Sequence, residues 1–262
     1  MTLGLGIILS LIALVGGVCI TTIGPGGIFV TIALFLLLNI DPATVAGTAS
    51  VTFIGTGLLG SYAYLRSGQL ATTTARNAAL VLSLTSVVGA FVGARLNTVL
   101  DADLFGLLLG AFVLMTGVII VVRERSRARA LEAPADFELN SPKGRLAMAG
   151  LGLAVGLPGG LLGVGGPVLA VPLMVVLGVP MLLAVALAQV QSIFIAAFAA
   201  LGFAMVDAID WGLAVLVGIP LFIGTIAGWV IARRIDPTRL KTGLAFVLVA
   251  LGIYMLSGAG AT

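Results

Sequence analysis

The sequence predicts an all-α polytopic membrane protein built from two inverted repeats of five segments, each with one short, glycine-preceded helix that is broken or re-entrant. Three observations predict this class: the composition, a series of apolar segments, and an internal repeat at one constant offset. Of the 262 residues, 60% are apolar and 9% are charged. Soluble domains are about 45–50% apolar and about 25% charged. The polar residues therefore cannot coat a water-soluble globule, and there is too little charge for a disordered or coiled-coil chain.

Eight apolar segments are close to the length of about 20 residues that crosses a bilayer as a helix. In chain order they span 3–23, 43–65, 75–96, 104–122, 146–164, 181–206, 211–232 and 240–257. Two more apolar stretches, 28–39 and 167–178, follow the glycine turns Gly24–Gly27 and Gly163–Pro167. Twelve residues reach only about 18 Å as a helix, against a hydrocarbon core of about 30 Å. Whether each short stretch crosses the membrane or turns back is left open.

An internal repeat relates the two halves of the chain. A shift of 139 residues superposes Gly17 on Gly156 and Gly24 on Gly163, and the pair Gly26-Gly27 on Gly165-Gly166. An odd number of segments in each half inverts the second half relative to the first. We therefore expect a first membrane repeat over 1–122, a cytoplasmic linker over 123–145 and a second membrane repeat over 146–262.

Basic residues predict the orientation. The linker 123–145 holds six basic residues, and the loops 66–76 and 233–241 also carry Lys or Arg, whereas Asp207–Asp210 has none. Cytoplasmic loops are enriched in Lys and Arg. We therefore expect a multi-pass protein of the cell membrane, plasma or inner, with these basic loops in the cytoplasm and both termini outside.

The two glycine turns are the first candidate site. A glycine-rich turn that feeds a helix aims free N–H groups and the positive end of the helix dipole at one point, which suits an anion. Two such turns related by inversion could face each other across one central site, contributed by Gly26, Gly27, Gly165 and Gly166. The alternative is that these glycines only let helices cross closely.

Polar residues on the helices after the short stretches are the second candidate. They are Thr48, Ser50 and Thr52 in the first half and Gln189, Gln191 and Ser192 in the second. Two Gln residues inside an apolar helix are costly unless they meet partners or water, so we expect them to line the site. The Thr and Ser hydroxyls could instead bond back to their own helix.

The residues that are missing exclude several chemistries. The chain has no His and one Cys, so an intrachain disulfide, a Cys/His metal cluster and a His general base are all excluded. No Asp lies at the centre of a predicted helix, and Asp41 and Asp236, each followed by Pro, would cap the helices that they precede. We therefore expect no catalytic residues, no metal and no cofactor, and we find no dedicated proton-relay carboxylate apart from Asp41 if its helix end is deep.

Several short motifs together resemble one family. Gly163-Val164-Gly165-Gly166-Pro167 with Val171-Pro172-Leu173 is similar to the glycine-rich signature of the TauE/SafE permeases, the sulfite exporter family. Ala46–Ser50 resembles the Thr/Ser segment of that family, and Gly68-Gln69 and Asp210-Trp211 resemble its turns. The resemblance covers nearly the whole chain and implies export of small sulfur-containing anions. The sequence departs from the family pattern at Gln189, Gln191 and Pro25, which leaves the particular anion open.

The expected function is therefore that of a permease exporting small anions of the sulfite and organosulfonate class by alternating access, driven by the membrane potential. The expected partners are the small anionic substrate and the lipid bilayer, without nucleic acid; a homodimer is left open. The alternatives are a carrier of small carboxylates, a proton-coupled anion importer, and, from other classes, an intramembrane enzyme or an assembly factor.

Overall fold

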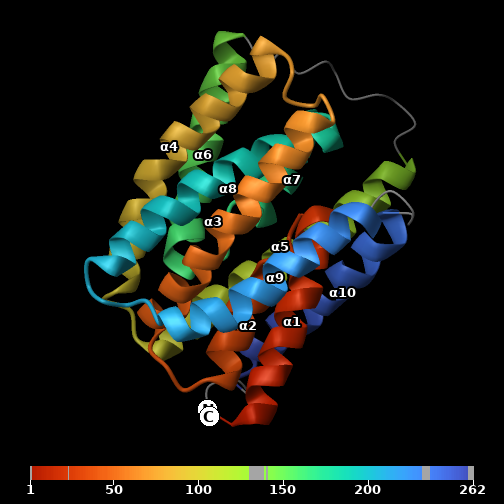
Figure 1. Ribbon diagram of the computed structural model, residues 1–262. Coiled ribbons are helices and arrows are strands. Elements are labelled where there is room, and N and C mark those ends of the chain that lie inside the picture. The colour runs from red at the N-terminus through yellow and green to blue at the C-terminus, as the bar shows by residue number, and fades with distance from the viewer. Residues whose placement is uncertain (1, 23, 130–138, 140, 232–236, 259–262) are drawn as a thin grey trace.

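The computed structural model describes residues 2–22, 24–129, 139, 141–231 and 237–258, with side chains described outside 123–129, 231 and 237–242. The described residues form ten helices and no strand (Figure 1). They are α1 (Leu3–Thr22), α2 (Ile28–Leu37), α3 (Pro42–Arg66), α4 (Thr73–Asn97), α5 (Ala102–Arg129), α6 (Pro142–Leu162), α7 (Pro167–Val176), α8 (Met181–Ala204), α9 (Trp211–Ile231) and α10 (Pro237–Leu256).

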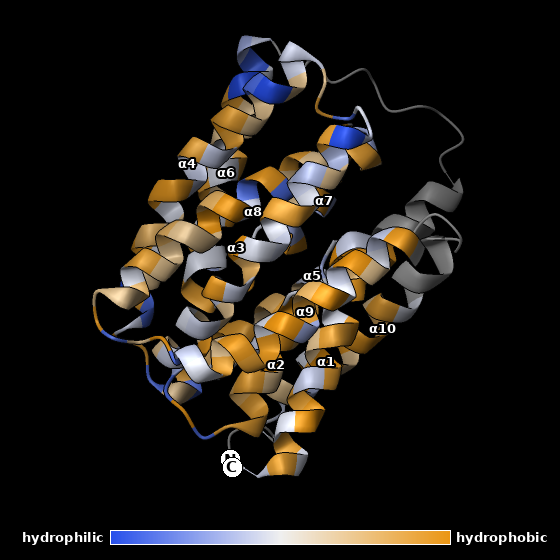
Figure 2. Cartoon of the chain, in the orientation of Figure 1, coloured by the Kyte–Doolittle hydropathy of each residue, from blue (hydrophilic) through white to orange (hydrophobic). Residues whose placement is uncertain are grey.

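Seven of the described helices are long and apolar enough to cross a membrane: α1, α3, α4, α5, α6, α8 and α9. Apolar residues cover the helices along their lengths, and polar residues gather near the ends (Figure 2). The chain is thus an all-helical polytopic membrane protein, as predicted. The remaining apolar helices are the ten-residue α2 and α7 and the segment Gly243–Leu256 of α10.

Two helix ends differ from the prediction at the linker between the halves. Helix α5 continues past Val122 to Arg129, and α6 begins at Pro142 rather than at 146. Hydropathy marks where a helix leaves the membrane and not where it ends; Arg and Glu are good helix formers in water, so α5 extends beyond its apolar part. Residues 130–138 and 140 of the linker lie outside the described part of the chain.

Polar side chains cap several helices at their first turn. Asp41 accepts a hydrogen bond from the backbone N–H of Thr44 at 3.0 Å, and Asp210 accepts one from Leu213 at 2.9 Å. Ser141 caps α6 through the N–H of Gly144 at 3.0 Å. Each cap satisfies a backbone donor that the helix itself cannot pair. The predicted cap role of Asp41 is confirmed, whereas Asp236 lies outside the described residues.

Helices from opposite halves pack most closely where glycines face backbone. Helix α1 lies along α9, and a Cβ atom on Gly17 would sit 2.1 Å from the carbonyl oxygen of Leu221. Helix α6 lies along α4 in the same way, since a Cβ on Gly156 would sit 2.3 Å from the carbonyl oxygen of Ser86. In lipid, such close approach supplies the dispersion contacts that hold helices together. A side chain at either glycine would force the helix pair apart.

Helices α3 and α8 lie in the middle of the bundle (Figure 1). They pack on each other, and each also packs on a neighbouring pair, α8 on α4 and α3 on α9. Of the apolar windows of the long helices, those of α3 and α8 are the most buried, at 61% and 56%. Polar residues on these two helices are therefore enclosed by protein rather than by lipid.

The short helix α2 turns back along α1. Gly26 packs against the backbone of Gly16 and Ile20, and Phe29 lies against Gly16 one turn further on. A Cβ on Gly26 would be 2.1 Å from the carbonyl oxygen of Gly16, so this return depends on a glycine. The turn that joins α1 to α2 therefore lies inside the bundle.

Candidate functional site between two glycine turns

The two glycine turns meet in the interior. Gly24 of the first turn lies against Val171 and Pro167 of α7, and the hydroxyl of Thr31 on α2 donates a hydrogen bond to the carbonyl oxygen of Gly163 in the second turn. Thr31 is fully buried, so this bond joins α2 to the start of α7 across the centre of the protein.

A small cavity of about 10 Å³ lies between the turns, about the room that one water molecule needs. It is lined by Ile20, Gly24, Gly27, Phe53, Thr56, Val164, Gly165, Pro167, Val168, Gln189 and Ser192. None of these side chains carries a charge. An ion held here would be stabilised by backbone N–H groups, helix dipoles and neutral donors alone.

Phe53 of α3 separates the two turns. One edge of its buried ring would lie 2.9 Å from a Cβ on Gly27, and the other edge 3.5 Å from a Cβ on Gly165. The absence of a side chain at Gly27 leaves room for the ring, whereas a Cβ on Gly165 would meet it at an ordinary contact distance. Phe53 therefore sets the size of the cavity in this conformation.

The second turn needs glycine for its backbone as well as for its space. Gly163 has φ +60° and Gly165 has φ +75°, in the left-handed region that side chains disfavour. In the described structure no side chain caps α2 at Gly27 or α7 at Gly166. Proline at position 167 begins α7 and removes one N–H. The remaining donors at the start of α7 are available to a ligand.

The polar residues of α8 lie beside these turns. Gln189 and Ser192 line the cavity, and both are almost fully buried. The carboxamide nitrogen of Gln189 donates a long bond of 3.5 Å to the carbonyl oxygen of Ile20 at the end of α1. Gln191 lies against Gly166, fully buried, and neither its oxygen nor its nitrogen has a hydrogen-bond partner among the described residues.

The predicted residues of α3 are not all brought to the turns. Thr48 accepts a hydrogen bond from the N–H of Asp210, 3.0 Å away, at the far end of the bundle. Ser50 and Thr52 donate to Ala46 and Ala49 of their own helix, both at 2.7 Å. None of the three lines the cavity, whereas Thr56, one turn beyond Thr52, does. Of the predicted glycines, Gly27 and Gly165 line the cavity, Gly26 packs on α1 and Gly166 packs on α8.

Sequence reasoning missed Phe53, because an aromatic residue in an apolar helix carries no signal of its own. Thr56 had a signal, since it continues the four-residue spacing of Thr44, Thr48 and Thr52 on one helix face.

A helical membrane protein with a small cavity that no charged side chain lines, between two helix starts that no side chain caps, has the architecture of a membrane transporter. The chain belongs to the TauE/SafE sulfite exporter family, whose sequence profile matches residues 9–255. It is 25% identical over 242 residues to "Probable membrane transporter protein YdhB" of Bacillus subtilis, which covers 92% of this chain and 96% of that protein. It is 26% identical over 181 residues to "Probable membrane transporter protein YunE" of the same organism, covering 66% of this chain and 64% of the relative. No solved structure matches the chain significantly.

Proposed function

We propose that this membrane transporter exports small sulfur-containing anions of the sulfite and organosulfonate class, and that the anion binds between the glycine turns of α2 and α7. One observation carries the proposal. Both turns line a single cavity, and beside it Gln191 is a fully buried amide whose donor and acceptor atoms have no partner among the described residues. A buried polar group normally has a partner, so an unpaired one beside two helix starts favours a ligand that completes it.

The anion would be held without a countercharge. Backbone N–H groups near Gly27 and Gly165, the amides of Gln189 and Gln191, and the hydroxyls of Ser192 and Thr56 would surround it. Hydrogen bonds to a charged group contribute about 1.5–3 kcal/mol each. A few such hydrogen bonds are enough to bind an anion. Because none of them is an ion pair, the anion can still be released.

The helix contacts support an inverted duplication. Gly17 meets Thr225 where α1 crosses α9, and Gly156 meets Ser86 where α6 crosses α4. Adding 139 to 17 and to 86 gives 156 and 225, so the offset of the sequence repeat relates both partners of the two contacts. We infer two membrane repeats, 1–122 and 146–262, joined by the linker 123–145, each with one re-entrant hairpin that ends in a short helix.

The direction follows from charge and potential. The loop between α3 and α4 and the start of α6 lie at one end of the bundle, and the loop 205–210 lies at the other with the start of α1 and the end of α10 (Figure 1). We place the first end, which carries Arg66 and Arg76, in the cytoplasm. Moving one negative charge outward across 100 mV, negative inside, releases about 2.3 kcal/mol, so export needs no coupling ion.

The test is flux in proteoliposomes. Radiolabelled sulfite, a sulfonate and acetate are compared with and without an imposed potential, with the Gly26→Leu variant as an inactive control. We expect sulfite or sulfonate flux that rises with the potential. Flux of acetate alone would favour a carboxylate carrier, and flux that follows a pH gradient but not the potential would favour a proton-coupled importer.

A further inference from the structure

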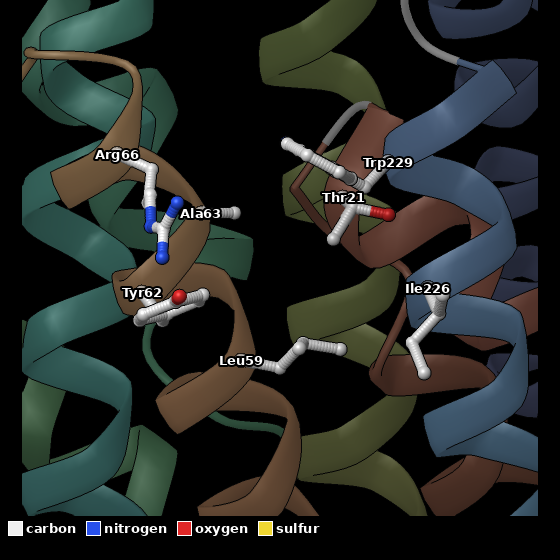
Figure 3. A pocket seen from close by; sticks show the side chains of 7 residues that line it. All are labelled: Thr21, Leu59, Tyr62, Ala63, Arg66, Ile226 and Trp229. Carbon is white, nitrogen blue, oxygen red and sulfur yellow. The ribbon is translucent and has the colours of Figure 1, made fainter.

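A second hollow lies beside the cavity, at the end of the bundle that carries Arg66. It is a crevice of about 340 Å³ lined by Thr21, Leu59, Tyr62, Ala63, Arg66, Ile226 and Trp229. Helix α3 forms one wall, and α1 and α9 form the other (Figure 3). Leu59 and Trp229 point into the space from opposite walls (Figure 3). The crevice runs from Arg66, on the last turn of α3, inward to Leu59.

One side chain separates this crevice from the cavity between the glycine turns. The carboxamide oxygen of Gln189 lies 2.5 Å from the position of a Cβ on Gly60, and its nitrogen faces the carbonyl oxygen of Ile20. Gly60 follows Leu59, and Ile20 precedes Thr21, and both Leu59 and Thr21 line the crevice. Gln189 itself lines the cavity. Its carboxamide therefore spans from α3 to α1 in the layer between the two hollows.

The equivalent position in the second half is closed by packing. A shift of 139 relates α3 and α9, on the two sides of the crevice, to α8 and α4. Ala63 then corresponds to Gly202 of α8, where an added Cβ would lie 2.9 Å from the Cβ of Ala94 on α4. Helix α8 therefore packs directly on α4 there, whereas the crevice separates α3 from α9 beside Ala63. The conformation is thus asymmetric between the halves.

Arg66 is the charged group at the mouth of the crevice. Its guanidinium lies 5.3 Å from the centre of the Tyr62 ring, which holds it over the crevice wall. A positive charge at the mouth of a cleft with apolar walls raises the local concentration of anions. The remaining lining of the crevice is almost wholly apolar and contains no acidic residue that would repel an anion electrostatically.

We propose that this crevice is the access passage for the anion from the Arg66 end, that Gln189 is the gate between passage and cavity, and that Arg66 draws the anion to the mouth. The inference rests on the proposed anion site, since it assigns how that site is reached. The gate opens when the carboxamide leaves Gly60 and Ile20, and it then remains available as a donor to the anion in the cavity. The structure is the state in which this gate is shut and the opposite side is packed closed.

The test measures thiol reactivity in nanodiscs and needs no knowledge of the substrate. Cys19 is replaced by Ser, and a new thiol is placed either in the crevice, as Leu59→Cys, or in the cavity, as Ser192→Cys. Each is reacted with an anionic and with a neutral methanethiosulfonate of similar size. We expect the crevice thiol to react readily and the cavity thiol slowly.

Changing the gate should affect the cavity thiol alone. Gln189→Ala should raise the reaction rate at Ser192→Cys about tenfold, because the barrier to local opening is removed, and leave the rate at Leu59→Cys unchanged. Gln189→Met should keep the cavity thiol slow, because it fills the same space. Gly60→Ala should act like Gln189→Ala, since the new Cβ displaces the carboxamide. If the cavity thiol stays slow in Gln189→Ala and in Gly60→Ala, Gln189 is not the gate.

The role of Arg66 is tested by the charge of the reagent. Arg66→Gln should slow the anionic reagent at Leu59→Cys about threefold and leave the neutral reagent unchanged, and Lys143→Gln, at the same end, should change neither. Lipid tails filling the crevice would make Leu59→Cys unreactive with both reagents and would overturn the passage. If the labelling follows this pattern but no sulfite or sulfonate flux is found, the passage stands and the proposed substrate class fails.

Discussion

The carboxamide oxygen of Gln191 lies 3.4 Å from the position that a Cβ atom on Gly166 would occupy. Glycine at the start of α7 therefore lets a buried amide approach the backbone where the first N–H groups of the helix are uncapped. Neither polar atom of Gln191 has a partner in the described part of the chain. An unpaired buried amide costs about 1–3 kcal/mol, and the proposed anion site would explain why one is retained at this position.

The first prediction follows from that cost. Gln191→Leu should melt at the same temperature as the wild type or above it, because an apolar side chain of similar size removes two unpaired polar atoms. The same change should weaken anion binding about tenfold, because one donor to a charged ligand is lost. Thermal melts and isothermal titration with sulfite measure the two effects.

Thr116→Val is the matched control for Gln191. Thr116 on α5 is also fully buried, and its hydroxyl is unpaired among the described residues. The change should leave stability equal or higher and leave binding intact. If Gln191→Leu melts well below the wild type and binds sulfite normally, Gln191 is a packing residue.

The second prediction concerns Gly165. Alanine there must adopt φ near +75°, which costs about 1–2 kcal/mol, while its Cβ meets Phe53 at an ordinary contact distance of 3.5 Å. Gly165→Ala should therefore fold, with a lower melting temperature, and bind the anion more weakly, because the new methyl group occupies the cavity.

The Gly68→Ala variant separates the effect of backbone strain from the effect of filling the cavity with a methyl group. Gly68 has φ +83° in the turn after α3, and in the described structure nothing lies within 4 Å of the added Cβ. It should show a similar loss of stability with unchanged anion affinity. If titration gives the same anion affinity for Gly165→Ala and Gly68→Ala, Gly165 is not part of the binding site.

The third prediction is that Phe53 limits the size of the anion. Phe53→Leu shortens the side chain that fills the space between the turns. The transport rate of larger sulfonates should therefore rise relative to that of sulfite. The ratio of their transport rates should rise about tenfold, the usual effect of a few carbon atoms in a selective pocket. Competition flux in proteoliposomes gives this ratio directly.

Phe105→Leu is the control for Phe53. Phe105 is fully buried and packs edge-on against Phe35 with ring centres 5.1 Å apart, away from the cavity. Both variants should lose comparable stability because both lose buried aromatic area. If Phe105→Leu changes selectivity as much as Phe53→Leu does, the effect is general loosening of the bundle.

The orientation gives the fourth prediction. In a Cys19→Ser background, Ser126→Cys should be modified by an impermeant thiol reagent from the cytoplasmic side, and Asn39→Cys, in the loop before α3, from the outside. The physical reason is that Arg and Lys around the linker resist translocation across the membrane. Modification of Ser126→Cys from the outside alone would invert the proposed topology.

The helices were largely predictable because each carries its own signal, whereas the contacts of the site were not. Apolar length located α1, α3 and the other long helices, and the glycine turns marked α2 and α7. Gln189 and Gln191 were recognisable because burying an amide inside an apolar helix costs free energy unless the amide finds a hydrogen-bond partner. Hydroxyls are ambiguous in this respect: Ser50 and Thr52 satisfy themselves on their own helix, and only the packed structure brings Thr56 to the cavity.

The role of Phe53 and the crevice could not be predicted from sequence. Both depend on distances between helices that are remote along the chain, such as α3 and α9, and those distances follow from glycine contacts summed over the whole bundle. The offset of 139 residues relates the positions of those contacts, yet it treats the two halves alike and does not predict the crevice between α3 and α9.

The last prediction tests how the transport is driven. Asp41 is exposed and caps α3, accepting hydrogen bonds from the N–H of Thr44 at 3.0 Å and from its hydroxyl at 2.6 Å. It does not line the cavity. Asn is as good a helix cap as Asp, so Asp41→Asn should change stability by less than about 1 kcal/mol and retain most of the flux. The flux should follow an imposed potential equally well in wild type and variant, measured in proteoliposomes at fixed pH. Loss of transport in a variant that melts normally would make Asp41 a proton carrier, and the potential-driven mechanism would then be wrong.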